Sequence, residues 1–276
     1  MAESKTNKQL KKQPKTIEFP GQLIVLGCGT SVGVPAIGCQ CEVCSSDHPR
    51  NQRSRCSVIL GLPEGNLLID TSPDLRTQLN REGIGIVHTV AFTHEHSDHI
   101  MGFDDLRLMQ FYLGEAVPVF CNQAVRKRLQ NAFDYVFSDD EVTHVGAVPR
   151  VELNLIDGPF DVLGSTVTPV PLEHGPRFNV LGFRIGNVAY CTDVKTIPET
   201  SKSLLQNLDV LILSALRPTP HATHMSIDEA IECARELGAK KTYFTHCSCS
   251  VDYETVMNYL PEGFEVAYDG LRIPLT

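Results

Sequence analysis

The chain has 276 residues, of which 42% are hydrophobic and 21% are charged, and this composition is typical of a folded protein with a substantial core. Its formal net charge of −9 disfavours nucleic acid as a partner, although bound divalent cations would reverse the sign locally. No apolar run reaches the roughly 18 residues of a membrane span, and the first residues lack the apolar segment of a signal peptide. We therefore expect a cytoplasmic protein that has no membrane partner.

Residues 1–18 are rich in lysine and contain few large apolar side chains. That composition predicts a disordered basic tail, with targeting or nucleic-acid contact as the alternative role. No internal repeat or low-complexity linker follows, so we interpret residues 19–276 as a single domain.

Short β runs dominate the first half of the chain. Ser72 as N-cap and Pro73 at the first helical position predict a helix that extends to about Arg81. Two further helices are expected at Asp104–Leu113 and Gln123–Phe133. The expected strands of this half are Leu23–Leu26, Ser57–Gly61, Leu67–Ile69, Thr89–Phe92 and Pro118–Cys121.

The second half repeats this pattern of strands and helices. Ser226 and Glu229 form a capping box, and Gly238 ends the helix that follows it. Two β-rich halves, each with its own helices, predict an α/β protein of four layers, an αββα sandwich. The expected strands are Val162–Val170, Leu181–Ile185, Val188–Cys191, Val210–Leu213, Thr242–Phe244 and Phe264–Ala267.

A dense group of metal-binding residue types follows the strand that ends at Phe92. His94, His96, Asp98 and His99 lie within six residues, and neutral imidazole and carboxylate are typical ligands of Zn²⁺, Mn²⁺ and iron. Alternating positions in an extended loop can direct His94 and His96 at one point, while Asp98 and His99 enter a helical turn and can face a second point. A histidine-rich loop without catalysis is the weaker alternative.

This motif resembles the His-x-His-x-Asp-His signature of the metallo-β-lactamase superfamily, and the resemblance extends from about Leu23 to the C-terminus. It implies the metallo-β-lactamase fold and three later ligands, each after a strand: His174, Asp193 and His246. The implied assignment places Asp193 between two divalent ions. One ion is held by His94, His96 and His174, and the other by Asp98, His99 and His246.

Two such ions, zinc or manganese, hold a bridging hydroxide that attacks the substrate. Nitrogen and oxygen ligands admit both metals, so the ligand set leaves the choice between them open.

A second cluster of metal-binding residues, Cys39-x-Cys41-x-x-Cys44, lies on a tight turn after the first strand. Clustered cysteines in a reducing cytosol are more often metal ligands than disulfides, although free thiols are the alternative. Within the superfamily, this turn resembles PhnP-type phosphodiesterases, which bind a structural zinc with three such cysteines and a histidine. The position of that histidine is Cys249 here, and the competing fourth ligands are His48 and Cys247. The same resemblance implies a homodimer.

His224 lies just before the capped helix, in the context where related phosphodiesterases carry a histidine near the scissile phosphate. By resemblance, His224 binds the phosphoryl group and protonates the leaving alkoxide, which a near-neutral pKa would suit. His221 is the competing acid, and a histidine that merely flanks the helix is the weaker alternative. The resemblance thus implies a phosphodiesterase acting on a small molecule, such as a cyclic ribose phosphate.

Two other activities use the same histidine motif. An RNase Z-like tRNA 3′-processing endonuclease is disfavoured by the acidic balance and by the lack of a basic, glycine-rich arm. A thioester hydrolase of the glyoxalase II kind does not predict the cysteine cluster. A metal-binding module without catalysis is disfavoured by the complete ligand set.

Overall fold

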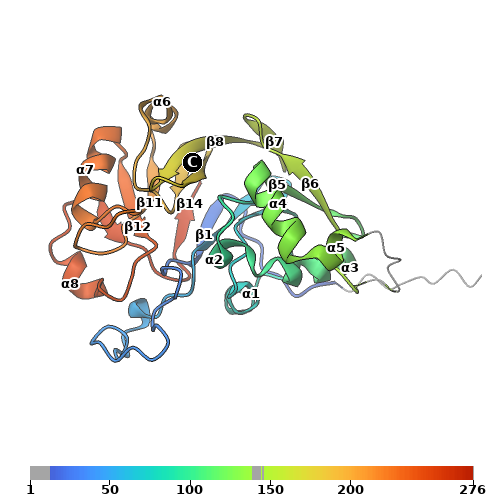
Figure 1. Cartoon of the computed structure of the whole chain (residues 1–276), viewed down its shortest axis with the longest axis horizontal. Coiled ribbons are helices and arrows are strands. Elements are labelled where there is room, and N and C mark those ends of the chain that lie inside the picture. The colour runs from blue at the N-terminus through green and yellow to red at the C-terminus, as the bar shows by residue number, and fades with distance from the viewer. Residues whose placement is uncertain (1–12, 139–143, 145, 276) are drawn as a thin grey trace, which may run out of the picture.

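Two seven-stranded sheets pack face to face in the computed structural model, which describes residues 13–138, 144 and 146–275 (Figure 1). The strands of the first sheet, in spatial order, are β14 (Arg272–Pro274), β1 (Gln22–Gly27), β2 (Ser57–Leu62), β3 (Gly65–Ile69), β4 (Thr89–Ala91), β5 (Val117–Cys121) and β6 (Val151–Leu155). Those of the second are β13 (Phe264–Val266), β12 (Lys241–Thr245), β11 (Val210–Ser214), β10 (Val188–Cys191), β9 (Phe178–Ile185), β8 (Ser165–His174) and β7 (Phe160–Val162).

Helices cover the outer face of each sheet, as Figure 1 shows. Associated with the first sheet are α1 (Leu75–Glu82), α2 (Ser97–Ile100), the 3₁₀ helix η2 (Phe103–Leu108), α3 (Met109–Leu113), α4 (Gln123–Ala132) and α5 (Asp134–Phe137). With the second are α6 (Glu199–Lys202), the 3₁₀ helix η3 (Ser203–Leu205), α7 (Ile227–Leu237) and α8 (Tyr253–Met257), while the 3₁₀ helix η1 (Pro49–Asn51) lies in the loop after β1. The fold is therefore the predicted αββα sandwich.

The strand pattern explains why two sheets form three apolar layers. In β1, Leu23 and Val25 face the core between the sheets, whereas Ile24 and Leu26 face the core under the outer helices. Successive side chains of a strand point to opposite faces, so a strand buried on both sides is apolar throughout. The third layer lies between the second sheet and α7, whose buried residues repeat at helical spacing.

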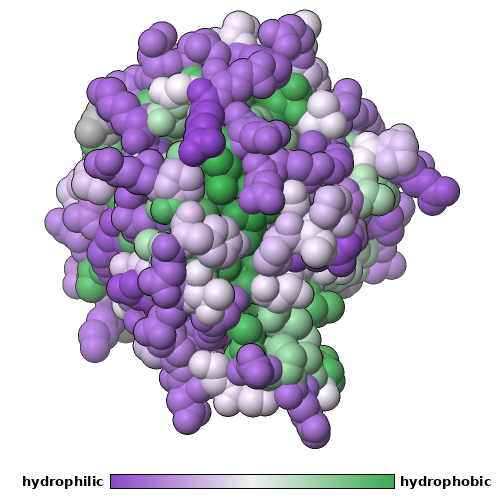
Figure 2. Space-filling model, turned by 90° about the vertical axis from the view of Figure 1, so that its left-hand side faces the viewer, coloured by the Kyte–Doolittle hydropathy of each residue, from purple (hydrophilic) through white to green (hydrophobic). Residues whose placement is uncertain are grey.

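The outer face formed by α6, α7 and α8 is mainly hydrophilic, with a narrow hydrophobic band down its middle (Figure 2). Helix α7 is amphipathic, with its apolar residues buried. Within the described part of the chain, no helix has both the length and the apolar composition needed to cross a membrane.

Some predicted boundaries are wrong. The expected strand Val162–Val170 is a hairpin of β7 and β8, because the chain reverses at Leu163 and Gly164, both with positive φ. Helix α1 begins at Leu75 rather than Pro73, because the Ser72 hydroxyl accepts a hydrogen bond from the Asp74 amide without capping the helix.

Several other elements differ from expectation. The predicted helix Asp104–Leu113 is split into η2 and α3, and β6, β14 and α8 were not expected. Of the expected basic tail, residues 1–12 lie outside the described residues. The Ile17 amide donates to Gly83 O at 3.0 Å, so the end of that segment contacts the domain.

Strand ends bring the candidate ligands to one edge of the sandwich. β3 and β4 are parallel, as are β10, β11 and β12, so their carboxyl ends lie together. Asp70, Asp193 and His246 each follow such an end, and each adopts positive φ, at 65°, 53° and 57°. Left-handed backbone at non-glycine residues is uncommon and concentrates at functional sites.

Candidate metal centre

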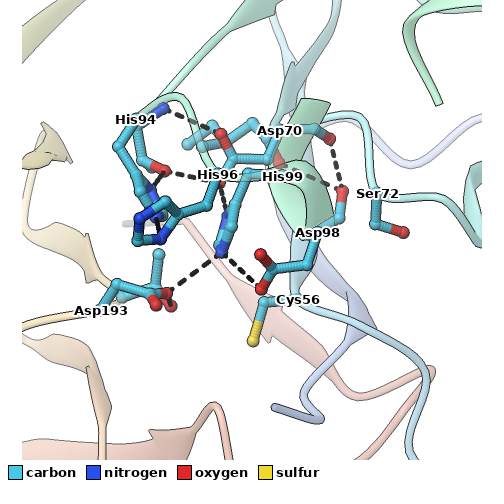
Figure 3. A network of polar contacts seen from close by, with 12 residues as sticks. Cys56, Asp70, Ser72, His94, His96, Asp98, His99 and Asp193 are labelled. Carbon is cyan, nitrogen blue, oxygen red and sulfur yellow. Dashed lines mark hydrogen bonds and ion pairs between the residues drawn. The ribbon is translucent and has the colours of Figure 1, made fainter. Parts of the chain in front are cut away.

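Four of the predicted ligands form one group, in which His96 is half-buried and the other three are buried. His94, His96, His174 and Asp193 each offer a ligand atom within 4.8 Å of the others. His94 Nε2 lies 3.0 Å from His96 Nδ1 (Figure 3). Two nitrogens bound to one zinc at about 2.0–2.1 Å would lie roughly 3.3 Å apart in tetrahedral geometry, so this spacing suits a shared cation.

The other three predicted ligands form a second group beside the first. Asp98, His99 and His246 are buried, with ligand atoms within 4.8 Å of one another. His99 Nε2 lies 3.2 Å from Asp98 Oδ2, and His246 Nε2 lies 3.8 Å from the same oxygen. The structure thus places all seven predicted metal ligands at one edge of the fold.

Asp193 lies between the two groups. One carboxylate oxygen is 3.2 Å from His99 Nε2, and the other is 3.2 Å from His246 Nε2 and 3.9 Å from His174 Nε2. The two 3.2 Å contacts lack hydrogen-bond geometry, so the Nε2 atoms of His99 and His246 remain buried without a hydrogen-bond partner among the described residues. Buried polar atoms are normally paired. Two unpaired imidazole nitrogens that face the Asp193 carboxylate form an arrangement that suits bound cations.

Asp70, which was not predicted as a site residue, orients these ligands. Its carboxylate accepts hydrogen bonds from Thr93 N and Thr93 Oγ1, each at 2.8 Å. It also accepts one from His99 Nδ1 at 2.7 Å, and both of these residues are labelled in Figure 3. Because the one hydroxyl proton of Thr93 goes to Asp70, Thr93 Oγ1 accepts from His94 Nδ1 at 3.0 Å. Asp70 therefore places the Nδ1 protons of both histidines and leaves their Nε2 lone pairs toward the centre, as such carboxylates do in metal sites.

His174 is oriented in the same way by a main-chain group. Its Nδ1 donates to the carbonyl oxygen of Thr223 at 2.8 Å, which leaves Nε2 free to face Asp193. The turn after His174 packs closely on this loop, since a Cβ at Gly175 would lie 2.6 Å from Thr223 Cγ2.

The charges within the centre keep its carboxylates ionised. Burial by itself would raise the pKa of Asp193, but in the metal-free centre the positive charges of His246 and His99 in their protonated forms outweigh it and hold that pKa well below its usual range. A bound cation would displace those protons and supply the positive charge in their place. Burial likewise opposes ionisation of Asp98, and the charge of His99 outweighs it and lowers the Asp98 pKa. Burial and the charge of His99 lower the pKa of His94, so its imidazole is neutral and able to bind a metal.

His224 lies beside the centre, as predicted. It is 8% exposed, its ring stacks on that of His246 at 4.8 Å, and its Nδ1 is 4.0 Å from Asp193 Oδ1. His221 lies further out, with its ring 5.3 Å from that of His224. The expectation of a near-neutral pKa for His224 is wrong, because burial, and then the charge of His246, lowers its pKa to about 3. In the ligand-free protein His224 is therefore a neutral imidazole.

The cysteine cluster is assembled from two distant segments. The thiols of Cys39, Cys41, Cys44 and Cys249 lie within 4.8 Å of one another. Main-chain amides of Cys44 and Ala36 donate to Cys41 Sγ and Cys44 Sγ, each at 3.4 Å. The Cys44 amide lowers the pKa of Cys41 to about 7, whereas burial raises that of Cys44 to about 12. A bound cation would stabilise the thiolate of Cys44 and so offset the effect of burial on its pKa.

The structure also places the two competing fourth ligands. Cys247 is buried elsewhere, with Sγ 3.7 Å from Thr245 O. His48 accepts a hydrogen bond from the Arg50 amide through Nδ1, and its Nε2 lies 3.5 Å from Glu254. Only Cys249 of the three candidates lies in the cluster. Since Cys249 follows His246 by three residues, a metal here would tie the loop after β1 to the metal centre.

Comparison with known families identifies the class of protein. Residues 65–247 match the family model described as the beta-lactamase superfamily domain, and the chain belongs to this superfamily. It is a metal-dependent hydrolase of the metallo-β-lactamase fold, and it resembles the PhnP family. The resemblance to the PhnP family rests on a crystal structure described as a new diphosphatase from that family. The two chains are 39% identical with a TM-score of 0.86, and the match covers 92% of this chain and 98% of that one.

Two other relatives extend the comparison. An octanoyltransferase of Porphyromonas gingivalis is 34% identical over 252 residues, which are 90% of this chain but only 50% of that protein. The chain thus spans about half the length of this relative. The Zn²⁺-bound PqqB of Methylobacterium extorquens has 20% identity and a TM-score of 0.70, with 92% of this chain and all of that one covered, and so shares the fold.

Proposed function

We propose that this hydrolase is a phosphodiesterase that uses two divalent metal ions to cleave a small-molecule phosphodiester. The observation that carries the proposal is the position of Asp193, whose two carboxylate oxygens face separate groups of histidines. One ion would be held by His94, His96 and His174, the other by Asp98, His99 and His246, with Asp193 shared. Zinc and manganese both suit these nitrogen and oxygen donors.

When bound, such ions supply an activated water and neutralise charge on the phosphoryl oxygens. The remaining groups of the site act on the substrate. His224 lies beside the two ligand groups, with its Nδ1 4.0 Å from Asp193 Oδ1, and as a neutral imidazole it donates an N–H to a phosphoryl oxygen. A bound phosphoryl group brings negative charge, which raises the pKa of His224 and allows it to protonate the leaving oxygen. His224 is thus the proposed catalytic and substrate-binding residue.

A second candidate function is hydrolysis of a phosphoric anhydride. The relative that is 39% identical is named a diphosphatase, and anhydride and diester cleavage both displace an oxygen from phosphorus. The same centre and the same His224 serve both reactions. We do not propose octanoyl transfer for this chain, because half of the octanoyltransferase has no counterpart in it.

The proposal includes features outside the reacting centre. Cys39, Cys41, Cys44 and Cys249 would hold one structural zinc. Residues 19–276 would act as one domain, assembled as a cytoplasmic homodimer that does not bind nucleic acid. Light scattering of the purified protein tests the dimer.

A metal-reconstituted activity panel tests the proposed function. It compares zinc- and manganese-loaded protein on bis(p-nitrophenyl) phosphate, a cyclic ribose phosphate, ADP, precursor tRNA and a glutathione thioester. We expect turnover of the small diesters, with ADP cleavage marking the anhydride reaction. Turnover of the thioester alone, or of precursor tRNA alone, would overturn the proposal.

A further inference from the structure

His96 is restrained differently from the other histidines of the first ligand group. Its Nδ1 lies 3.0 Å from His94 Nε2, so Nδ1 faces the centre and Nε2 carries the proton when an ion is bound. His94 and His174 have the opposite orientation, because a hydrogen bond at Nδ1 directs Nε2 inward. Nε2 of His96 has no hydrogen-bond partner among the residues that the structure describes. His96 therefore lacks the outer hydrogen bond to protein that usually orients a histidine ligand.

The ring of Phe178 packs beside this imidazole. The two ring centroids are 4.4 Å apart and the ring planes meet at 71°, which is an edge-to-face arrangement. The rings of His94 and His174 lie 4.6 Å and 5.2 Å from that of His96, but both belong to proposed ligands of the same ion. Phe178 and His96 are both half-buried. Phe178 is thus the described ring neighbour of His96 that is available to support it from outside the ligand group.

The main chain fixes Phe178 in this position. Phe178 is the first residue of β9 and pairs in register with His174 at the end of β8. Directly opposed residues of two antiparallel strands have their side chains on the same face of the sheet, and these two rings are 6.1 Å apart. Further along β9, the Leu181 amide donates to Thr93 O at 3.0 Å. The hairpin that carries Phe178 is therefore attached to the segment that carries His96.

We infer that Phe178 is a positioning residue of the metal centre, whose ring holds the His96 imidazole with Nδ1 toward the first ion. The edge-to-face contact takes the place of the hydrogen bond that orients His94 and His174. Phe178 acts through His96, so its effect appears first in the binding of that ion and only then in turnover. The inference rests on the two-metal site of the proposed function.

The test measures zinc binding by the metal-free full chain in competition with a chromophoric chelator. F178A should weaken binding at the histidine site roughly three- to tenfold, the size of one lost aromatic pair, and leave the cysteine-bound zinc in place. F178Y keeps the ring and should bind zinc as the wild type does. F178L keeps apolar volume without a ring and should resemble F178A. If F178A does not fold, the difference between F178L and F178Y carries the same comparison, and equal affinities of these two would overturn the inference.

Phe160 provides a matched control, because it is also a half-buried phenylalanine of the second sheet. Its ring stacks on that of Phe120 at 4.2 Å and meets that of Phe183 at 6.5 Å, so it supports other core rings rather than a ligand. F160A should lower the melting temperature of the metal-free protein, as F178A does, but leave zinc affinity unchanged. Wild-type zinc affinity in F178A, or an equal loss in F160A, would overturn the inference.

Cobalt-loaded protein gives a second readout, since its visible absorption depends on the ligand geometry of the ion. F178A should alter the spectrum and F160A should not, and an F178A spectrum identical to that of the wild type would overturn the inference. Metal binding also separates this inference from the proposed function. If the wild type binds zinc at the histidine site and cleaves no phosphodiester, the proposed function fails, and the zinc comparison still decides the role of Phe178.

Discussion

Replacing Asp70 by asparagine should reverse a hydrogen bond at His99 while leaving the shape of the site unchanged. Asparagine can keep its carbonyl oxygen toward the Thr93 amide, which donates to Asp70 at 2.8 Å. Its amide nitrogen then occupies the position of the oxygen that accepts from His99 Nδ1 at 2.7 Å. That nitrogen only donates, so the proton of His99 moves to Nε2, the atom that faces Asp98 and Asp193.

A protonated Nε2 cannot bind a metal, so the variant must displace that proton before the ion binds. Loss of such a supporting carboxylate typically costs 10–100-fold in metal affinity or activity, or about 1.4–2.8 kcal/mol. His94 is affected less directly, because Thr93 lies between it and Asp70.

The assay is a zinc titration of metal-free protein in competition with a chromophoric chelator, followed by turnover at saturating metal. D228N is the matched control, since Asp228 is exposed on α7 and its replacement removes the same charge. We expect weaker zinc binding in D70N and unchanged binding in D228N. Wild-type affinity and turnover in D70N would refute the role given to Asp70.

The remaining predictions concern the cysteine cluster, the helix cap and the pH dependence. C249S should contain one zinc fewer and melt at a lower temperature than C233S, which removes a thiol from α7, and equal metal contents would contradict this. S226A should lower stability by about 1 kcal/mol, because its hydroxyl caps α7; thermal denaturation should show a midpoint roughly 2–4 °C lower. The pKa of His224 is lowered to about 3 when the protein folds. Between about pH 6.5, the unfolded value, and the folded value, the unfolded chain binds a proton at His224 that the folded protein does not, so the free energy of unfolding falls as the pH falls. Denaturant titrations should therefore show a flatter pH dependence in metal-free H224Q than in wild type.

The fold and the clustering of the seven candidate ligands could be predicted, the fold from local patterns and the three later ligands from the family resemblance. Strands buried on both faces are apolar throughout, and a ligand that follows a strand end is visible in the sequence, as at Thr192-Asp193 and Thr245-His246. Asp70 also follows a strand end, but its partners are Thr93 and His99, and only the pairing of β3 with β4 brings them together.

Two further features depend on tertiary packing and were missed for that reason. The low pKa of His224 results from burial and from the charge of His246, neither of which is encoded in neighbouring residues. The division of the predicted strand Val162–Val170 follows from a two-residue turn at Leu163 and Gly164, whose positive φ values place an apolar leucine where a glycine or asparagine would mark the turn.

In the proposed mechanism Asp193 is shared by two catalytic metal ions. Metal analysis of purified wild type and D193A, together with hydrolysis of bis(p-nitrophenyl) phosphate by the same samples, tests it most directly. We predict three ions per wild-type chain, and in D193A loss of hydrolysis and of the ions at the histidine site, with the cysteine-bound zinc retained. A D193A variant that keeps all three ions and full activity would contradict the two-metal site.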